Sequence, residues 1–418
     1  MMNAIEKMRR AMTAIAYGAS TRSFNAIIES EREAFMGLQV VFATKVKQTD
    51  LHGILLDQMS VHCPLVSNAM GAQGLLFYSD DAYARTLAGE TEIAIDYSIS
   101  FDKNVCEAMR LIVAGKNVSQ PENFRALLHL VMGRGEQSLN FDYFAYLAEE
   151  HTHFNVPGNT RPKDTLRALK LLDFVVPDSL YESPLLPRFN DDPAELARRI
   201  DDVMRNVIGS PLMTDIVAGQ RGTYAMMLQA VLLSWQNDIG GVEKLQRLVQ
   251  CSLHALGRFA KTEVYLGWKM FGGAGAIPAF FDPTSKAGAG IAQKVSGMAW
   301  DVAFLRNTER LAGARRAVGR RKAEFFVPLI ASYDRRFKLL IQACPLSAIV
   351  TDPALGVTNS IFVDELAFQE ALYAAGIDQK LGSVDAQLAR LNSNLDSCAV
   401  EAHIARLEQQ VHERCAGV

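Results

Sequence analysis

Two aspartates stand where a predicted strand meets a predicted helix. Asp102 follows the strand-like run EIAIDYSISF, and Asp334 follows PLIASY and precedes two arginines. In a parallel sheet such junctions lie at the carboxyl ends of the strands, where open α/β sheets bind ligands. Asp301 lies in the helical segment GMAWDVAFL, where an unpaired charge would be costly. Three converging carboxylates repel one another, so we expect them to bind Mg²⁺ or Mn²⁺, cations that prefer oxygen ligands.

The elements around these residues alternate between strands and helices. β-branched and aromatic residues predict strands at 38–46, 92–101, 324–332 and 346–352. Apolar residues at helical spacing predict a helix after each of Asp102 and Asp334 and another around Asp301. Strands that alternate with helices favour a parallel sheet, so we expect an α/β fold.

The predicted α/β fold has a parallel-sheet core that contains a large all-helical insertion. Pro-rich residues 155–193 and the helical pattern from 194 to 271 mark this insertion, and a helical segment is expected at the C-terminus. The expected divisions are a mixed N-terminal segment (1–90), the core (91–150 and 290–365), the helical insertion (151–289) and C-terminal amphipathic helices (366–418).

Composition narrows the class of protein. The 418 residues are 49% hydrophobic and 21% charged, with a net charge of −3, which is ordinary for a globular protein. None of the six cysteines forms a CxxC pair, and scattered cysteines suit a reducing compartment. No apolar stretch approaches the roughly 20 residues of a membrane span. We therefore expect a cytoplasmic protein that has no membrane partner.

The motifs, taken in order, resemble a PIN-like nuclease domain. The matching segments are FDKN (Asp102 to Asn104), AWDVAFLRNTE (Asp301) and ASYDRRF (Asp334). The resemblance covers about 90–150 and 290–365 and implies an acidic residue on the intervening helix. Glu149 is the match there, and Glu150 and Glu263 compete with it.

The resemblance implies an endoribonuclease that hydrolyses RNA with metal-activated water. Asp102, Glu149, Asp301 and Asp334 would bind Mg²⁺ or Mn²⁺, as implied by the family. RNA is therefore expected as the nucleic-acid partner in preference to DNA. The family includes toxins, RNA-processing enzymes and anti-phage effectors.

A local excess of basic residues accompanies the last two motifs. Residues 306–338 contain ten basic and three acidic side chains, and basic zones favour contact with phosphates. Arg335, Arg336 and Asn104 are the candidates for substrate binding. The helical segments would supply contacts for a homo-oligomer or a regulatory protein.

A non-enzymatic interpretation remains open for each acidic residue. An aspartate before a helix usually caps it, and a buried aspartate usually pairs with a nearby arginine. A basic run is often a solvated helix face. Under this hypothesis the chain is a helical scaffold that binds proteins through residues 194–271 and the C-terminal helices. Convergence of Asp102, Asp301 and Asp334 on one site would instead favour the nuclease.

Overall fold

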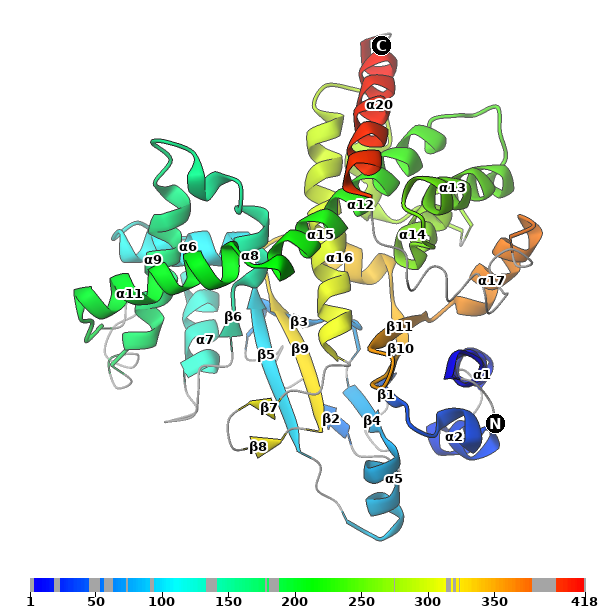
Figure 1. The fold of residues 1–418 in the computed structure, drawn as a ribbon, viewed down its shortest axis with the longest axis horizontal. Coiled ribbons are helices and arrows are strands. Elements are labelled where there is room, and N and C mark those ends of the chain that lie inside the picture. Colours follow the sequence, from blue (N-terminus) through cyan, green and yellow to red (C-terminus); the bar gives the residue numbers. More distant parts are fainter. Residues whose placement is uncertain are drawn as a thin grey trace.

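The computed structural model contains two main sheets surrounded by helices (Figure 1). The residues it describes are 4–18, 23–44, 53–55, 63–72, 74–90, 94–132, 141–176, 179, 188–273, 275–312, 317–318, 321–322, 324–377 and 396–416. None of the described helices is both long and apolar enough to cross a lipid bilayer.

The five-stranded sheet has the order β11-β10-β1-β4-β2, and every pairing in it is antiparallel. Its strands are β1 (Gln39–Thr44), β2 (Gly53–Leu55), β4 (Gly74–Tyr78), β10 (Leu346–Asp352) and β11 (Val357–Phe362). Alternate side chains of β1 enter different cores, as the pleat of a strand requires. Val40 and Phe42 pack in a small N-terminal core, whereas Val41 belongs to the main core.

Three N-terminal helices cover the outer face of the five-stranded sheet. They are α1 (Ala4–Gly18), α2 (Phe24–Ser30) and α3 (Arg32–Phe35). Ile15, Ile28 and Phe35 are fully buried in the small core with Phe42. This sheet therefore has packed layers on both faces.

The four-stranded sheet has the order β3-β9-β5-β6 and is mixed. Its strands are β3 (Val66–Asn68), β5 (Ile95–Phe101), β6 (Phe141–Asp142) and β9 (Phe325–Ala331). β5 runs parallel to β9 and to β6, whereas β3 is antiparallel to β9. A separate two-stranded ribbon pairs β7 (Ala317–Val318) with β8 (Arg321–Lys322).

The remaining helices surround the four-stranded sheet. In Figure 1, helices α6 to α11 gather to its left, and α13, α14 and α20 lie above it to the right. The long helices α12 and α15 pack on each other, and α15 also packs on β9. The bounds are α5 (Asp80–Leu87), α6 (Lys103–Val113), α7 (Pro121–Met132), α8 (Phe144–Glu149), α9 (Arg161–Leu171), α11 (Pro193–Val203), α12 (Pro211–Ser234), α13 (Gly241–Ala255), α14 (Lys261–Met270), α15 (Ile291–Ala312), α16 (Arg335–Ala343), α17 (Glu365–Ala374) and α20 (Ser397–Ala416).

The predicted α/β fold with a parallel-sheet PIN-like core is wrong. Strands do form within the four predicted segments, but β1 and β10 belong to the antiparallel sheet and only β5 and β9 to the mixed one. The alternation of strands and helices along the chain did not reveal this division. One main core nevertheless joins side chains from β5, β9, α12, α15 and α20.

A short turn explains why β10 cannot continue a parallel sheet. Only four residues separate β10 from β11, and parallel neighbours need a crossover of a dozen residues or more. The Asp352 Oδ1 atom accepts hydrogen bonds from the backbone N–H groups of Ala354 and Leu355, and Gly356 has a φ of +65°. This turn chemistry produces an antiparallel hairpin, which then pairs with β1.

Gly356→Ala is expected to destabilise the protein by about 1 kcal/mol, because an L side chain disfavours the positive φ of this turn. Gly219→Ala is the matched control. Gly219 lies within α12 with open space around its Cα, so alanine there should stabilise by about 0.5–1 kcal/mol. Urea denaturation of both variants measures the two effects, and equal effects would contradict the hairpin assignment.

Candidate active site

The register of β5 and β9 determines where the first carboxylates lie. Phe101 pairs with Ala331 at the carboxyl ends of both strands, so Asp102 and Ser332 emerge side by side. The Asp102 backbone N–H donates to the Ala331 carbonyl at 3.0 Å, and the Ser332 hydroxyl donates to Asp102 Oδ2. The Asp334 backbone N–H in turn donates to Ser332 Oγ at 2.8 Å. Ser332 therefore connects the two junction aspartates.

Helix α15 brings Asp301 to the same place. Gly297, Trp300, Asp301, Phe304 and Asn307 recur three or four positions apart, which places them on one face of the helix. Val302 and Leu305, on other faces, are fully buried in the main core. Core packing therefore orients the polar face of α15 toward the ends of β5 and β9.

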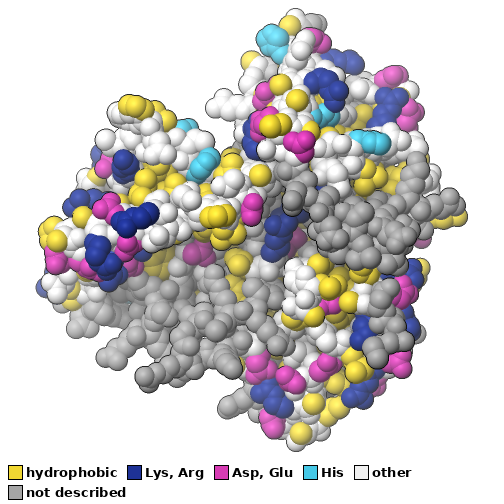
Figure 2. All heavy atoms as spheres, in the orientation of Figure 1, with side chains coloured by type: hydrophobic (Ala, Val, Ile, Leu, Met, Phe, Trp, Pro, Cys, Tyr) yellow, Lys and Arg dark blue, Asp and Glu magenta, His cyan; other side chains and the backbone are white. Residues whose placement is uncertain are grey.

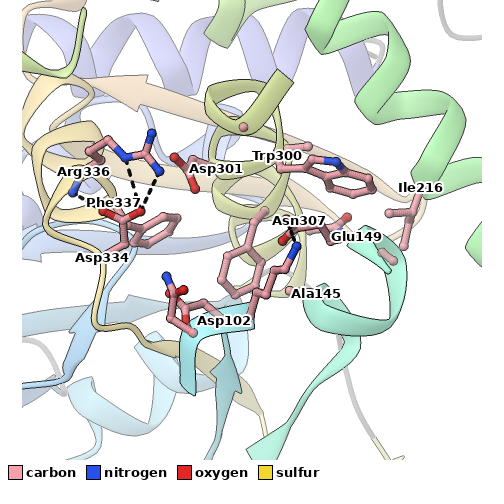
Figure 3. Close-up of a pocket in the computed structure, with 16 residues that line it drawn as sticks. Asp102, Ala145, Glu149, Ile216, Trp300, Asp301, Asn307, Asp334, Arg336 and Phe337 are labelled. Atoms are coloured by element: carbon pink, nitrogen blue, oxygen red, sulfur yellow. Dashed lines mark hydrogen bonds and ion pairs between the residues drawn. The ribbon is translucent and has the colours of Figure 1, made fainter. Parts of the chain in front are cut away.

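A pocket of about 280 Å³ lies between these elements (Figure 3). Four carboxylates line it, from Asp102, Glu149, Asp301 and Asp334. The other chemically distinct lining residues are the amides Asn104 and Asn307, the cations Lys103 and Arg336, and the apolar side chains Ile216, Trp300, Phe304 and Phe337. Figure 3 shows Asp301 near Asp334 and Arg336, with Trp300 and Ile216 toward the other end of the pocket. The three aspartates singled out in the sequence thus share one pocket.

Three of the four carboxylates already have protein partners. Asp102 caps α6 by accepting from the Val105 backbone N–H at 2.9 Å. Asp334 caps α16 through the Arg336 backbone N–H at 2.7 Å and pairs with that side chain at 3.0 Å. Glu149 pairs with Lys103 at 2.9 Å. Capping is therefore a structural role of Asp102 and Asp334, in addition to any chemical role.

Asp301 differs from the other three carboxylates. Its Oδ2 atom is shielded from solvent and has no hydrogen-bond partner among the described residues. Burial raises the pKa of Asp301 well above its ordinary value, and the charge of Asp334 raises it further, although Arg336 opposes this. A buried carboxylate oxygen without a partner is costly, so this atom is available to a ligand.

Asp102 also resists ionisation. Burial raises the pKa of this carboxyl to about 6, against the lowering effect of its hydrogen bonds from Ser332 and Val105. The charge of Asp334 contributes to the increase. Two carboxyls in one pocket therefore have a pKa displaced toward neutrality, a property that is common at functional sites.

The competing acidic residues lie elsewhere. Glu150 faces Lys103 and His153, at 2.5 and 3.0 Å, and does not line the pocket. Glu263 is buried in α14, where it pairs with Arg306 at 2.6 Å. Of the three acidic candidates considered for the intervening helix, only Glu149 lines the pocket.

The expected basic zone contributes little to the pocket. Arg336 lines it, whereas Arg335 is exposed and does not. Arg315, Arg316 and Arg320 lie outside the described residues. Lys, Arg, Asp and Glu side chains are interspersed over the face drawn in Figure 2, without a continuous basic band among the described residues.

The carboxylates of the pocket can bind Mg²⁺ or Mn²⁺ only together with water or phosphate oxygens as further ligands. Within the described part of the chain, no three His, Cys, Asp or Glu side chains lie close enough together to hold a metal ion by themselves. Mg²⁺, however, is usually bound by one or two carboxylates, with water and phosphate oxygens as its other ligands. The unpartnered Oδ2 of Asp301, with Asp334 beside it, provides such a partial set.

Several residues that line or position the site were missed in the sequence. Lys103 neighbours Asp102, and Trp300 neighbours Asp301, so both stood inside the motifs that were considered. Asn307 could have been found by following the helical period from Trp300 and Phe304. Ser332 had no such signal, because its role depends on the register between two distant strands.

Asp301→Asn is expected to stabilise the protein in metal-free buffer by about 1 kcal/mol or more at pH 8, since it removes a buried charge. The raised pKa makes wild-type stability fall as pH rises above the ordinary aspartate range. The advantage of the variant should therefore shrink as pH falls toward 4. Thermal unfolding across this pH range, with exposed Asp201→Asn as the control, measures the difference. A pH-independent difference would contradict the assignment.

Comparison with known proteins adds no family to this geometry. The chain matches no protein-family model, and no curated protein and no solved structure is significantly similar to it. A functional proposal for this chain therefore has to be argued from the chemistry of the pocket.

Proposed function

We propose that the pocket is the active site of a Mg²⁺- or Mn²⁺-dependent nuclease, an enzyme that hydrolyses phosphodiesters, with RNA as its expected substrate. One observation carries the proposal: four carboxylates from separate elements line one pocket, and the buried Oδ2 of Asp301 has no hydrogen-bond partner in the described chain. The order of the carboxylate motifs, which resembles that of PIN-like nucleases, supports RNA as the substrate.

Asp301 and Asp334 are the proposed cation ligands, and Asp102 and Glu149 line the same pocket. A bound cation would lower the pKa of a water molecule and stabilise charge on the scissile phosphate. The Ser332 hydroxyl donates a hydrogen bond to Asp102 and accepts one from the Asp334 backbone N–H. These two bonds fix the position of Asp334 relative to Asp102. The β5–β9 junction therefore positions the ligands before substrate arrives.

The other polar residues would bind and orient the substrate. Arg336 and Lys103 place positive charge beside Asp334 and Glu149, where phosphate oxygens would otherwise meet only carboxylates. Asn104 and Asn307 offer amide donors and acceptors to the substrate. Asp102, with a pKa of about 6, is the proposed proton acceptor at neutral pH.

The rival function is a non-enzymatic scaffold in which the acidic residues are helix caps. The caps made by Asp102 and Asp334 favour it. Capping does not account for Asp301, which lies in the interior of α15 and has a buried, unpartnered oxygen. We therefore prefer the enzyme. Six free cysteines fit a reducing compartment, and we propose the cytoplasm as its location.

Cleavage of single- and double-stranded RNA and DNA, with Mn²⁺, with Mg²⁺ and with chelator, tests the proposal. Asp301→Asn and Asp334→Asn should each lower the cleavage rate by about 100-fold or more, because they remove a proposed cation ligand. Asp201→Asn, on the exposed side of α11, should leave it unchanged. Cleavage that survives both the chelator and Asp301→Asn would exclude the mechanism. Folded protein without activity on any substrate would favour the scaffold.

The pH dependence of cleavage tests the role of Asp102. With saturating Mn²⁺, the rate should fall about tenfold for each pH unit below the pKa of Asp102, because the protonated carboxyl cannot accept a proton. This pKa is about 6 without metal, and a bound cation lowers it. Asp102→Asn should abolish this limb and lower the rate at pH 8. An acid limb that is the same in wild type and Asp102→Asn would exclude Asp102 as the proton acceptor.

A further inference from the structure

A second group of charged side chains lies on another side of α15. Arg306 and Arg310 are on this helix, and Arg258 belongs to the connection between α13 and α14. We call these three residues the arginine cluster. Arg306 is five positions after Asp301, which turns it about 140° around the helix. The arginine cluster is therefore separate from the pocket, and none of its members lines that pocket.

Glu263 is the carboxylate that neutralises part of the arginine cluster. Its Oε1 atom pairs with Arg306 Nη1 at 2.6 Å and accepts a hydrogen bond from the Thr223 hydroxyl at 2.6 Å. The charge of Arg306 helps to keep the pKa of Glu263 below its ordinary value despite complete burial. Glu263 therefore supplies one negative charge, and its direct ion pair is with Arg306.

The other neighbouring charges do not neutralise Arg258 and Arg310. Glu309 is buried, and burial raises its pKa although Ser360 donates a hydrogen bond to it at 2.6 Å. Lys261 adds positive charge nearby but is paired with Glu365 at 2.8 Å. Around the arginine cluster, positive charge therefore exceeds negative charge.

The side chains of Arg258 and Arg310 have no hydrogen bond or ion pair within the described chain, and the Nε atom of Arg258 is shielded from solvent. Burial lowers the pKa of the Arg258 guanidinium, and the charge of Arg306 lowers it further. A guanidinium stays protonated in proteins, so the strain cannot be relieved by loss of a proton. A buried guanidinium N–H without a partner, beside two further guanidinium groups, marks a place where a bound anion would be stabilised.

We propose that Arg258, Arg306 and Arg310 form a binding site for the phosphate group of a small ligand. Guanidinium groups hold phosphate through paired hydrogen bonds, and several of them can share its oxygens. Arg310 is exposed, whereas Arg258 and Arg306 are half-buried, so solvent reaches the arginine cluster at Arg310. The site is independent of the proposed nuclease activity.

Thermal unfolding of the full chain, with chelator present, tests this site without any cleavage. Wild type should unfold about 3 °C or more higher in millimolar pyrophosphate than in sodium chloride of equal ionic strength. Arg310→Ala should lose this shift. It should also fold normally, because Arg310 is exposed and makes no hydrogen bond in the described chain. Arg247→Ala removes an arginine of α13 whose ion pair is with exposed Glu243, and it should keep the full shift.

Two further unfolding measurements test whether the guanidinium groups recognise a terminal phosphate. Arg258→Lys keeps the charge but loses the fork of donors, so it should show a smaller pyrophosphate shift than wild type. A short oligonucleotide without terminal phosphates should give no shift. Equal unfolding temperatures in pyrophosphate and chloride would overturn the proposal. So would equal shifts in Arg310→Ala and Arg247→Ala, or a shift with the oligonucleotide alone.

Discussion

The parallel pairing of β5 with β9 is the constraint on which the candidate site depends. The pairing of Phe101 with Ala331 ends both strands at one level, and Ser332 then binds Asp102 and the backbone of Asp334. A slip of one residue would turn alternate side chains to the other face of the sheet and break this connection. α15, which packs on β9, adds Asp301 to the same edge. The carboxylates therefore converge through non-local pairing and packing.

Helix α15 lies between two groups of side chains that include buried polar atoms without a protein partner in the described chain. Asp301 has a buried oxygen without a partner on one side, and the arginine cluster has a positive excess on another. Both arrangements cost stability in the protein alone, and each is relieved by an ion of opposite charge. A structural role alone would favour neutral side chains at these positions. This shared pattern is the physical reason to assign ligands to both sides.

The sequence was informative where the chemistry is local. Asp102 and Asp334 could be placed at strand–helix junctions, and Asp301 on a helix, from short motifs alone. The sheet topology could not be predicted, because the β10–β11 turn sends β10 into the antiparallel sheet with β1. The short strand β4 (Gly74–Tyr78) was also missed, since all five of its residues are buried and show no alternation. The partner of Arg306, Glu263, lies 43 residues away on α14, which no local pattern reveals.

The central claim is that a divalent cation binds the unpartnered oxygen of Asp301. The most direct measurement is an anomalous difference map, recorded at the manganese absorption edge, from crystals of the wild-type chain grown with Mn²⁺. We predict a peak in the pocket within about 2.3 Å of Asp301 Oδ2, with Asp334 as a second ligand. A fully ordered pocket with no peak, or with Asp301 Oδ2 hydrogen-bonded to a protein group, would contradict the account.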